Sequence, residues 1–507
     1  MARTACLKIL TLVLLLASEL ANAQVYFNKN YINGLWGFWV HEVNGYYYSA
    51  FYKDQPQLSL GADYLFGKFN LQGDLVDSLI LSAPDTNLNP SVFSILDQGN
   101  IITTATKYWR DSTIQGEYRR QLMLISFNPQ LMDTNWIRYY GDSSVYYWDH
   151  IVYRSPYSPH YFLIGTEIPW QNYGLTLKVH LLKVDTLGNT IWQKTYLTQK
   201  NEVAPWITER PDRKLLMSCG RLEQGQFIDS VVQYTRLLDS NGNELNKKFF
   251  LTESPQYIAC SFIERDIPGR PEAFVFANRV DSVYDIWQHR YDYVMIGGMD
   301  TNREVIWRVN IDTAILRSPS NVWVLKGFED GKFILIVLDD NGFTKLNLWV
   351  ALYDKEVNRL WAHNYYHRFD GDHYPSDVIR TSDGGYLFSG VTNSTGPQNT
   401  QNAWLLKVDS NGCIDPLNCS PLNSPDWTMD EKPMQAYPNP TTSEIYFEQE
   451  RLGDMLWTIT CISGTGTSIY TKAIQAQAGR IRLDVSDLPS GLYLFRLNGT
   501  QVKIMKE

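Results

Sequence analysis

The chain is poor in cysteine and carries no surplus of positive charge. Six cysteines among 507 residues are too few for a fold held together mainly by disulfides. The formal net charge is -9, and no local basic stripe stands out in the sequence. A surface for nucleic acid is therefore not expected.

Motifs of the common catalytic families are also missing. The sequence contains no G-x-S-x-G elbow, no H-E-x-x-H pair and no phosphate-binding loop. One stretch, Thr381 to Phe388, loosely matches the Asp box of sialidases, but it occurs once and its Asp and Gly are explained by a turn. Catalytic carboxylates that come singly from distant segments leave no motif, so enzymatic activity stays open.

Beyond the first 23 residues, no apolar run approaches the length of a transmembrane helix. Residues 1–23 begin with Arg3 and Lys8, continue with a short apolar run and end in an A-x-A sequence at 21–23. This pattern is typical of a cleaved signal peptide. The mature chain is then expected to begin near Gln24, the alternative being a buried N-terminal helix.

Aromatic residues are abundant at 14%, with 32 Tyr and 16 Trp, which suits half-buried strand positions. One phrase, best preserved at Thr381 to Gly412, consists of a tight turn, an apolar strand, a polar loop, a second apolar strand and another tight turn. Its second turn occurs seven times. The anchoring residues of these turns lie at positions 70, 128, 185, 239, 300, 354 and 409.

The interval between these anchors is always between 54 and 61 residues, and four short strands fit each interval. A fourth strand with a Trp at one repeat position follows most of the turns, and we expect this Trp to be packed. Seven such units over residues 24–420 predict an all-β, seven-bladed β-propeller. A pair of β-sandwiches is the alternative, although it would not require seven equal intervals. The Trp position is filled by Trp136, Trp192, Trp307 and Trp361.

The seventh unit lacks its Trp strand, and residues 25–31 resemble that strand. We therefore expect the N-terminal segment to complete the last blade as its outer strand, which removes a loose edge. A disulfide between Cys413 and Cys419 would lie beside this closure, and two free thiols are the alternative. Cys219 and Cys461 lie in apolar strands and are expected in the core.

After a Pro-rich linker at 421–434, residues 435–507 change to alternating strands with Gly turns, which predicts a small Ig-like β-sandwich. Its motif residues are Tyr437, Pro438, Asn439, Pro440, Gly491, Tyr493 and Lys503. With these motifs the stretch resembles the type A C-terminal sorting domain of the type IX secretion system of Bacteroidetes. The resemblance implies an interaction with that secretion machinery, and a secreted or outer-membrane-surface location in a Gram-negative bacterium. An accessory sandwich that binds ligand is the alternative.

In such a propeller the connections after the second and fourth strands share one face. They are longer and more varied than the turns of the other face, as in Lys107 to Arg120 and Asn278 to Asp292. Function concentrates on such loops, and exposed rings there bind sugars or protein partners. The alternative is that these rings cover neighbouring blades. The candidates are Trp109, Trp148, Trp170, Trp206 and Trp287.

One short stretch is rich in possible metal ligands, but its spacing matches no specific site, and a solvated loop is the alternative. It contains His363, His367, Asp370, Asp372 and His373. No cofactor is expected.

The leading functional hypothesis is an exported binding or adhesion module for an unknown glycan or protein ligand. The alternative is a secreted carbohydrate-active enzyme, either a glycoside hydrolase or a lyase. A structural role in an extracellular assembly is a third option.

Overall fold

The computed structural model describes residues 26–33, 35–55, 61–82, 86–110, 118–141, 145–169, 177–196, 202–223, 230–254, 261–264, 272–284, 290–311, 319–340, 346–365, 373–393, 401–414, 435–448, 456–463, 468–475, 480–497 and 500–507. The predicted signal peptide and linker lie outside these residues. The chain divides into two compact units, Met1–Asn423 and Ser424–Glu507. Within the described parts, no helix is long and apolar enough to span a bilayer.

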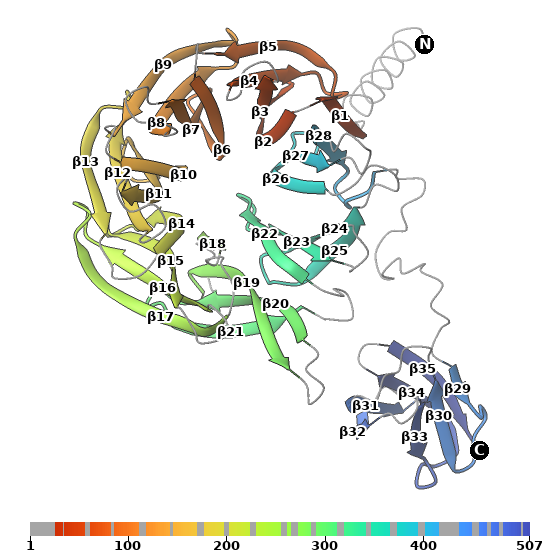
Figure 1. The fold of residues 1–507 in the computed structure, drawn as a ribbon. Coiled ribbons are helices and arrows are strands. Elements are labelled where there is room, and N and C mark those ends of the chain that lie inside the picture. The colour runs from red at the N-terminus through yellow and green to blue at the C-terminus, as the bar shows by residue number, and fades with distance from the viewer. Residues whose placement is uncertain are drawn as a thin grey trace, which may run out of the picture. The chain divides into compact units, whose positions relative to one another are not determined.

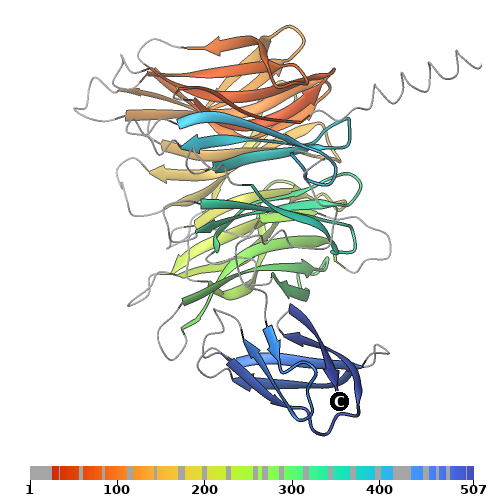
Figure 2. The same ribbon diagram turned by 90° about the vertical axis from the view of Figure 1, so that its right-hand side faces the viewer.

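Seven four-stranded antiparallel sheets form the first unit, and they surround a central axis as blades (Figure 1). In six blades the strands follow the chain from the axis outward. Seen from the side, neighbouring blades lie face to face (Figure 2). This arrangement confirms the predicted seven-bladed β-propeller and excludes a pair of sandwiches.

The strands of each blade, from the axis outward, have the following bounds. Blade 1 contains β2 (Leu35–Val43), β3 (Tyr46–Gln55), β4 (Gly61–Phe69) and β5 (Leu75–Leu81), and blade 2 contains β6 (Thr86–Asp97), β7 (Asn100–Arg110), β8 (Tyr118–Asn128) and β9 (Asp133–Tyr140). Blade 3 contains β10 (Val145–Arg154), β11 (His160–Pro169), β12 (Lys178–Asp185) and β13 (Thr190–Tyr196), and blade 4 contains β14 (Glu202–Glu209), β15 (Leu215–Glu223), β16 (Ser230–Leu238) and β17 (Glu244–Ser254). Blade 5 contains β18 (Ser261–Glu264), β19 (Phe274–Tyr284), β20 (Arg290–Met299) and β21 (Val305–Asn310), and blade 6 contains β22 (Pro319–Gly327), β23 (Phe333–Asp340), β24 (Leu346–Tyr353) and β25 (Arg359–Tyr365). Blade 7 contains β26 (His373–Arg380), β27 (Tyr386–Asn393), β28 (Gln401–Val408) and β1 (Phe27–Asn33).

The N-terminal strand closes the ring. β1 pairs antiparallel with β28, with Phe27 opposite Lys407 and Tyr31 opposite Ala403. It is the outermost strand of blade 7, which confirms the prediction made from its likeness to the Trp strands. Because the first and last segments of the propeller share one sheet, no blade is left with an unpaired third strand.

Alternating strand direction gives the propeller two different faces. The turns after the first and third strands of each blade lie on one face, called here the tight-turn face, and the other connections lie on the loop face. The strands extend further toward the loop face than the sequence indicated. Within the predicted loop Asn278 to Asp292, β19 continues to Tyr284 and β20 begins at Arg290, so the ends of this segment belong to a hairpin.

The repeated turn after each third strand is held by its Asp or Asn anchor. In blade 4, Oδ1 of Asp239 accepts hydrogen bonds from the backbone N–H of Asn241 at 2.9 Å and of Asn243 at 2.8 Å. The side chain and backbone of Asn243, followed by the backbone of Asn241, lower the pKa of Asp239. The repeated residue therefore stabilises the turn itself, because its side chain accepts hydrogen bonds from backbone N–H groups of the same turn.

Four of these turns also join neighbouring blades. In each, a Gly with a φ of +76° to +79° packs against an aromatic ring of the preceding blade's outer strand. A Tyr four residues after that ring donates its hydroxyl to the Gly carbonyl, and this contact forms what is called here a seam. The Tyr–Gly pairs are Tyr31 with Gly73, Tyr140 with Gly188, Tyr196 with Gly242 and Tyr365 with Gly412.

The other three turns lack the Tyr–Gly contact. They place Met132, Arg303 and Val357 in the left-handed region, and the preceding outer strands supply no such Tyr bond. At one of them, the Arg303 guanidinium instead donates to the side chain of Asn246 at 2.6 Å. The presence of Gly in the turn therefore follows the presence of Tyr in the neighbouring blade.

Most of the strands nearest the axis bulge in the middle, whereas β18 pairs with β19 without a register shift. Register shifts occur between Gly37 and Val40 and between Trp148 and Ile151, among others. Hydroxyls of second strands bond the carbonyls displaced by the bulges, as Ser49 does with Trp39 at 2.7 Å. Such bonds satisfy polar groups that are buried next to the axis.

The second unit is a β-sandwich, as predicted. Its sheets follow the orders β29-β30-β33 and β32-β31-β34-β35, and buried residues that include Phe447, Cys461 and Phe495 form its core. The strands are β29 (Gln435–Tyr437), β30 (Glu444–Glu448), β31 (Leu456–Ser463), β32 (Ser468–Gln475), β33 (Arg480–Asp484), β34 (Gly491–Leu497) and β35 (Thr500–Lys506).

Candidate functional site

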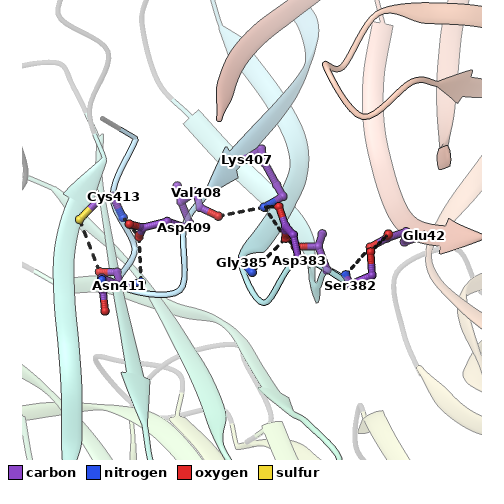
Figure 3. Close-up of polar contacts among 10 residues, drawn as sticks. Glu42, Ser382, Asp383, Gly385, Lys407, Val408, Asp409, Asn411 and Cys413 are labelled. Carbon is purple, nitrogen blue, oxygen red and sulfur yellow. Dashed lines mark hydrogen bonds and ion pairs between the residues drawn. The ribbon is translucent and has the colours of Figure 1, made fainter. Parts of the chain in front are cut away.

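The first turn of the best-preserved repeat, which contains Asp383, has a structural role. Both carboxylate oxygens of Asp383 lie 3.0 Å from Nζ of Lys407, whose side chain is fully buried (Figure 3). Burial lowers the pKa of Lys407, and Asp383 partly offsets that effect. The backbone N–H of Gly385 also donates to Asp383 at 3.1 Å. These bonds hold the turn, so the Asp-box-like residues serve folding.

The same turn contributes to ring closure. The backbone N–H of Ser382 donates to Glu42 of blade 1 at 2.7 Å (Figure 3). The next turn places Cys413 beside Asp409, whose Oδ1 accepts the Cys413 N–H at 2.7 Å. Cys413 is disulfide-bonded, and its pairing with Cys419 stays a prediction because Cys419 lies outside the described residues. Cys219 and Cys461 are free and buried in the core, as expected.

Two described carboxylates on the innermost strands also link blades. Asp97 of blade 2 pairs with Arg154 of blade 3 at 3.1 Å and accepts the hydroxyl of Tyr161. Asp377 of blade 7 pairs with Lys326 of blade 6 and accepts the Val40 N–H of blade 1 at 3.2 Å. These acids bind neighbouring blades, which accounts for their positions without a catalytic role.

The five candidate Trp residues differ in their structural environment. Trp206 packs against Phe262 and Phe274 of the next blade, with ring centroids 5.4 and 6.1 Å away. For Trp206 the alternative therefore holds, in which the ring covers a neighbouring blade. Trp148 lies in β10 beside the bulge. Trp170 and Trp287 lie outside the described residues, and Trp109 lies half-buried near the loop-side end of β7.

Trp109 belongs to a group of rings and cations at the loop-side end of blade 2. Lys107 and Trp109 project from one face of β7, because side chains two residues apart share a face. The Lys107 Nζ lies 6.0 Å from the Trp109 ring centroid and 5.5 Å from that of Tyr139. Tyr139 is 47% exposed, and Trp109 and Lys107 are half-buried, so ligands can reach this side of the sheet.

Strand pairing adds more polar groups to the same face. Arg119 lies opposite Trp109, and Gln121 lies opposite Lys107 across the β7–β8 hairpin. Directly opposed residues of antiparallel strands share a face, and the Gln121 side chain donates to the Gly141 carbonyl at 3.3 Å. Trp109, Lys107, Arg119, Gln121 and Tyr139 are called here the blade-2 cluster.

The reverse face of the same hairpin repeats the pairing of a ring with a cation. The Arg120 guanidinium lies 4.2 Å from the Tyr108 ring centroid, and the Asn89 amide donates to the Tyr108 hydroxyl at 3.4 Å. Of the blade-2 cluster, sequence reasoning found only Trp109. The detectable signal was a Lys-Tyr-Trp run followed by an Arg-Arg pair on predicted adjacent strands.

The His- and Asp-rich stretch is only partly described. His363 lies in β25, where its Nε2 is 2.9 Å from the Asn411 carbonyl of the next blade and its ring lies beside Trp361. His373 begins β26. His367, Asp370 and Asp372 lie outside the described residues. Among the residues that are described, no group of three or more His, Cys, Asp or Glu is arranged to hold a metal ion.

A buried histidine pair escaped the sequence reasoning. Nε2 of His150 lies 3.0 Å from Nδ1 of His180 in blade 3. Burial lowers the pKa of His180 to about 4. Gly165 accommodates the pair, because a Cβ there would lie 2.5 Å from the His150 ring. Burial therefore keeps His180 neutral at pH 7, and the two rings pack inside the blade.

The sorting-motif residues are part of the sandwich. The Asn439 side chain donates to the Lys503 carbonyl at 3.0 Å and accepts the Met505 N–H at 2.9 Å, so it pairs with β35 as a strand would. The Tyr493 hydroxyl donates to the Pro489 carbonyl at 2.7 Å. The Tyr437 ring stacks on Tyr446, with centroids 5.9 Å apart. Pro438 and Pro440 lie between β29 and β30, Gly491 begins β34, and Lys503 is exposed.

Comparison with known proteins gives one family match. The profile of the secretion system C-terminal sorting domain matches residues 435–507. No curated protein matches the sequence with significance.

Solved structures resemble the chain weakly. Polysaccharide lyase Uly1 has a TM-score of 0.43 at 9% identity, over 74% of this chain and 90% of its own. An α-L-arabinanase from Penicillium chrysogenum, solved with arabinobiose, has a TM-score of 0.39 at 9% identity, over 76% and 99%. An α-L-arabinofuranosidase from Fusarium graminearum has a TM-score of 0.38 at 8% identity, over 76% and 98%.

The sorting domain implies an interaction with the type IX secretion machinery, and hence export to a secreted or cell-surface location. The chain is an exported seven-bladed β-propeller that carries a secretion system C-terminal sorting domain at residues 435–507.

Proposed function

We propose that the propeller is an extracellular glycan-binding module, and that its ligand lies on the loop-side end of blade 2. The observation that carries this proposal is the pair of rings in the blade-2 cluster. Trp109 and Tyr139 are accessible on one face of a rigid sheet, with the Gln121 amide between them in the register. Aromatic rings pack on the apolar faces of sugars, and amides and cations bond the hydroxyls.

A glycan suits this cluster better than a protein does. A stable protein interface buries about 800 Å² on each partner and has an apolar centre. Tyr139 is the one strongly exposed large hydrophobic residue on the described loop-side end of blade 2, and the groups around it are polar or charged. A pyranose, which combines a small apolar face with many hydroxyls, matches such a surface.

A glycoside hydrolase or lyase on the same scaffold is the alternative function. Retaining glycosidases need two carboxyl groups about 5 Å apart, and inverting ones a wider separation. The described carboxylates Asp97 and Asp377 already bond neighbouring blades. A structural role accounts for these two carboxylates, and we therefore place binding ahead of turnover in the proposal.

A binding and turnover assay on the mature propeller tests the proposal. Soluble polysaccharides are screened by affinity electrophoresis, and the same mixtures are assayed for new reducing ends and for unsaturated products. Trp109→Ala and Tyr139→Ala should each weaken binding by roughly tenfold, equivalent to about 1.4 kcal/mol for a lost ring contact.

Tyr46→Ala is the matched control, because Tyr46 is 38% exposed on the opposite face and also lies under a lysine, Lys68, at 4.3 Å. Binding that survives Trp109→Ala and Tyr139→Ala would move the site elsewhere. Capture of a protein with no glycan bound, or turnover of a polysaccharide, would replace the proposal with one of its alternatives.

A further inference from the structure

We infer that the free edge of β5 is a self-association surface, at which blade 1 pairs with blade 1 of a second copy of this chain. Among the described strands β5 pairs only with β4, and its other edge lies at the rim of the propeller (Figure 1). The two copies would form one continuous antiparallel sheet, to which each contributes its four strands of blade 1. This inference is independent of the proposed glycan binding, because it uses no residue of the blade-2 cluster.

Apolar side chains of β5 are exposed to solvent. Leu75, Val76 and Ile80 are 46%, 50% and 45% exposed, respectively. The strand has the sequence LVDSLIL, which contains no proline and no cation, and its one charged residue is Asp77. Asp77 lies opposite Lys68 of β4 in the same sheet. β5 therefore presents an apolar edge whose backbone can pair with a strand of another chain.

The other six outer strands of the propeller differ from β5 in charge. Each of them contains at least one Lys or Arg, and a cation on an edge strand opposes pairing with another chain. Because one edge per propeller lacks this protection, association ends at a dimer with a two-fold axis and does not continue into a filament. The cations of the other outer strands are Lys29, Arg138, Lys194, Lys247, Lys248, Arg308 and Arg359.

The sequence of β5 is complementary to itself when two copies run antiparallel. The strand has 7 residues, and all of them overlap only when Ser78 lies opposite Ser78 of the second copy. In that register Val76 lies opposite Ile80 of the second copy, and the two-fold axis repeats this aliphatic pair on the same face of the sheet. Asp77 lies opposite Leu79, so no like charges are opposed. A register centred on Asp77 would instead oppose two carboxylates.

Covalent trapping tests this register in the mature chain. Ser78→Cys should form a disulfide between two copies under oxidising conditions, because directly opposed residues have Cα atoms about 4.5–5.5 Å apart, within the span of a disulfide. Val76→Cys is the matched control on the same face of the strand. Its two thiols would lie about 14 Å apart, since a strand advances about 3.4 Å per residue. Cys219 and Cys461 are buried and should not react. A non-reducing gel measures the covalent dimer.

Sedimentation velocity over a concentration series measures the association itself. Wild type should shift from monomer toward dimer as its concentration rises into the high micromolar range. Val76→Lys/Ile80→Lys should raise the dissociation constant at least roughly tenfold, because two aliphatic pairs become pairs of like charge. Val76→Lys/Ile80→Glu should associate roughly tenfold more tightly than that variant, because the same register then opposes unlike charges. Val309→Lys is the control on another outer strand, since Val309 of β21 is 52% exposed.

More covalent dimer from Ser78→Cys than from Val76→Cys, with loss of the dimer in Val76→Lys/Ile80→Lys and recovery in Val76→Lys/Ile80→Glu, would support the inference. Equal trapping of the two cysteine variants, or no recovery, would overturn the inferred pairing. A dimer that Val309→Lys weakens as much as Val76→Lys/Ile80→Lys does would place the interface elsewhere and overturn it too. A chain that stays monomeric at every concentration would leave this edge to a different partner and would also overturn the inference. None of these results depends on glycan binding.

Discussion

Replacing Gly188 with alanine tests whether the Tyr–Gly seams stabilise the propeller. Gly188 has a φ of +78°, and a Cβ there would lie 2.6 Å from Cγ of Arg138 and 3.0 Å from the Trp136 ring. Both neighbours belong to the preceding blade. The substitution therefore strains the turn and also pushes two blades apart.

Two other glycines separate these effects. Gly45 and Gly99 have φ values of +75° and +79°, and nothing lies within 4 Å of a Cβ built on either. Alanine at these controls costs only the left-handed conformation, about 1–2 kcal/mol. At Gly188, overpacking adds roughly 1–3 kcal/mol, so the expected loss is about 2–5 kcal/mol.

Urea unfolding followed by tryptophan fluorescence measures the difference in the free energy of unfolding between each variant and the wild type. Gly188→Ala should lose more stability than Gly45→Ala or Gly99→Ala. If all three lose the same amount, the contact across the seam contributes nothing beyond the turn itself, and this account of the seams is wrong.

Three further predictions follow. Tyr140→Phe removes the 2.6 Å bond to the Gly188 carbonyl and should cost about 1 kcal/mol in the same urea assay; no loss would refute a role for the hydroxyl. The folded-state pKa of His180 is lowered from 6.5 to about 4, so its contribution is complete above pH 6.5 and is lost as pH falls through about 4, a loss of about 3 kcal/mol. His180→Gln should flatten this part of the stability–pH curve, and an unchanged curve would contradict the assignment. Asn439→Ala removes both side-chain bonds to β35 and should reduce the amount of protein at the cell surface, measured by fractionation; normal display would show that this pairing is dispensable for export.

Much of the propeller could be predicted from the sequence, because each repeated anchor depends only on contacts within its own turn. Each Asx anchor bonds its own backbone, as Asp239 does with Asn241 and Asn243, so the spacing of the anchors reports the blade interval. The closing strand was also visible. Its Phe27 and Tyr31 occupy the positions of the ring and Tyr in the other outer strands.

The sequence also contains the signal for the Tyr–Gly seams, but this signal relates residues of two neighbouring blades. Gly occurs in a turn when the preceding blade ends in Tyr, as with Gly188 and Tyr140, and residues such as Val357 replace it otherwise. This correlation spans 48 residues for that pair. It becomes recognisable only when the packing of one blade on the next is known.

The candidate site was the hardest part to predict. Trp109 was singled out as a ring, whereas Lys107 and Arg119 looked like ordinary loop cations until the strand register placed them around it. Trp206 was a candidate on the same grounds as Trp109, but its ring packs against Phe262. Exposure and packing of a Trp depend on the neighbouring blade, which a single strand does not reveal.

The most direct test of the central claim is the position of a bound oligosaccharide on the propeller, measured by a crystal structure of the complex. The account predicts a sugar ring on Trp109 or Tyr139, with its hydroxyls within bonding distance of Gln121 or Lys107. A ligand on the tight-turn face or in the central channel, with this end of blade 2 unoccupied, would contradict it.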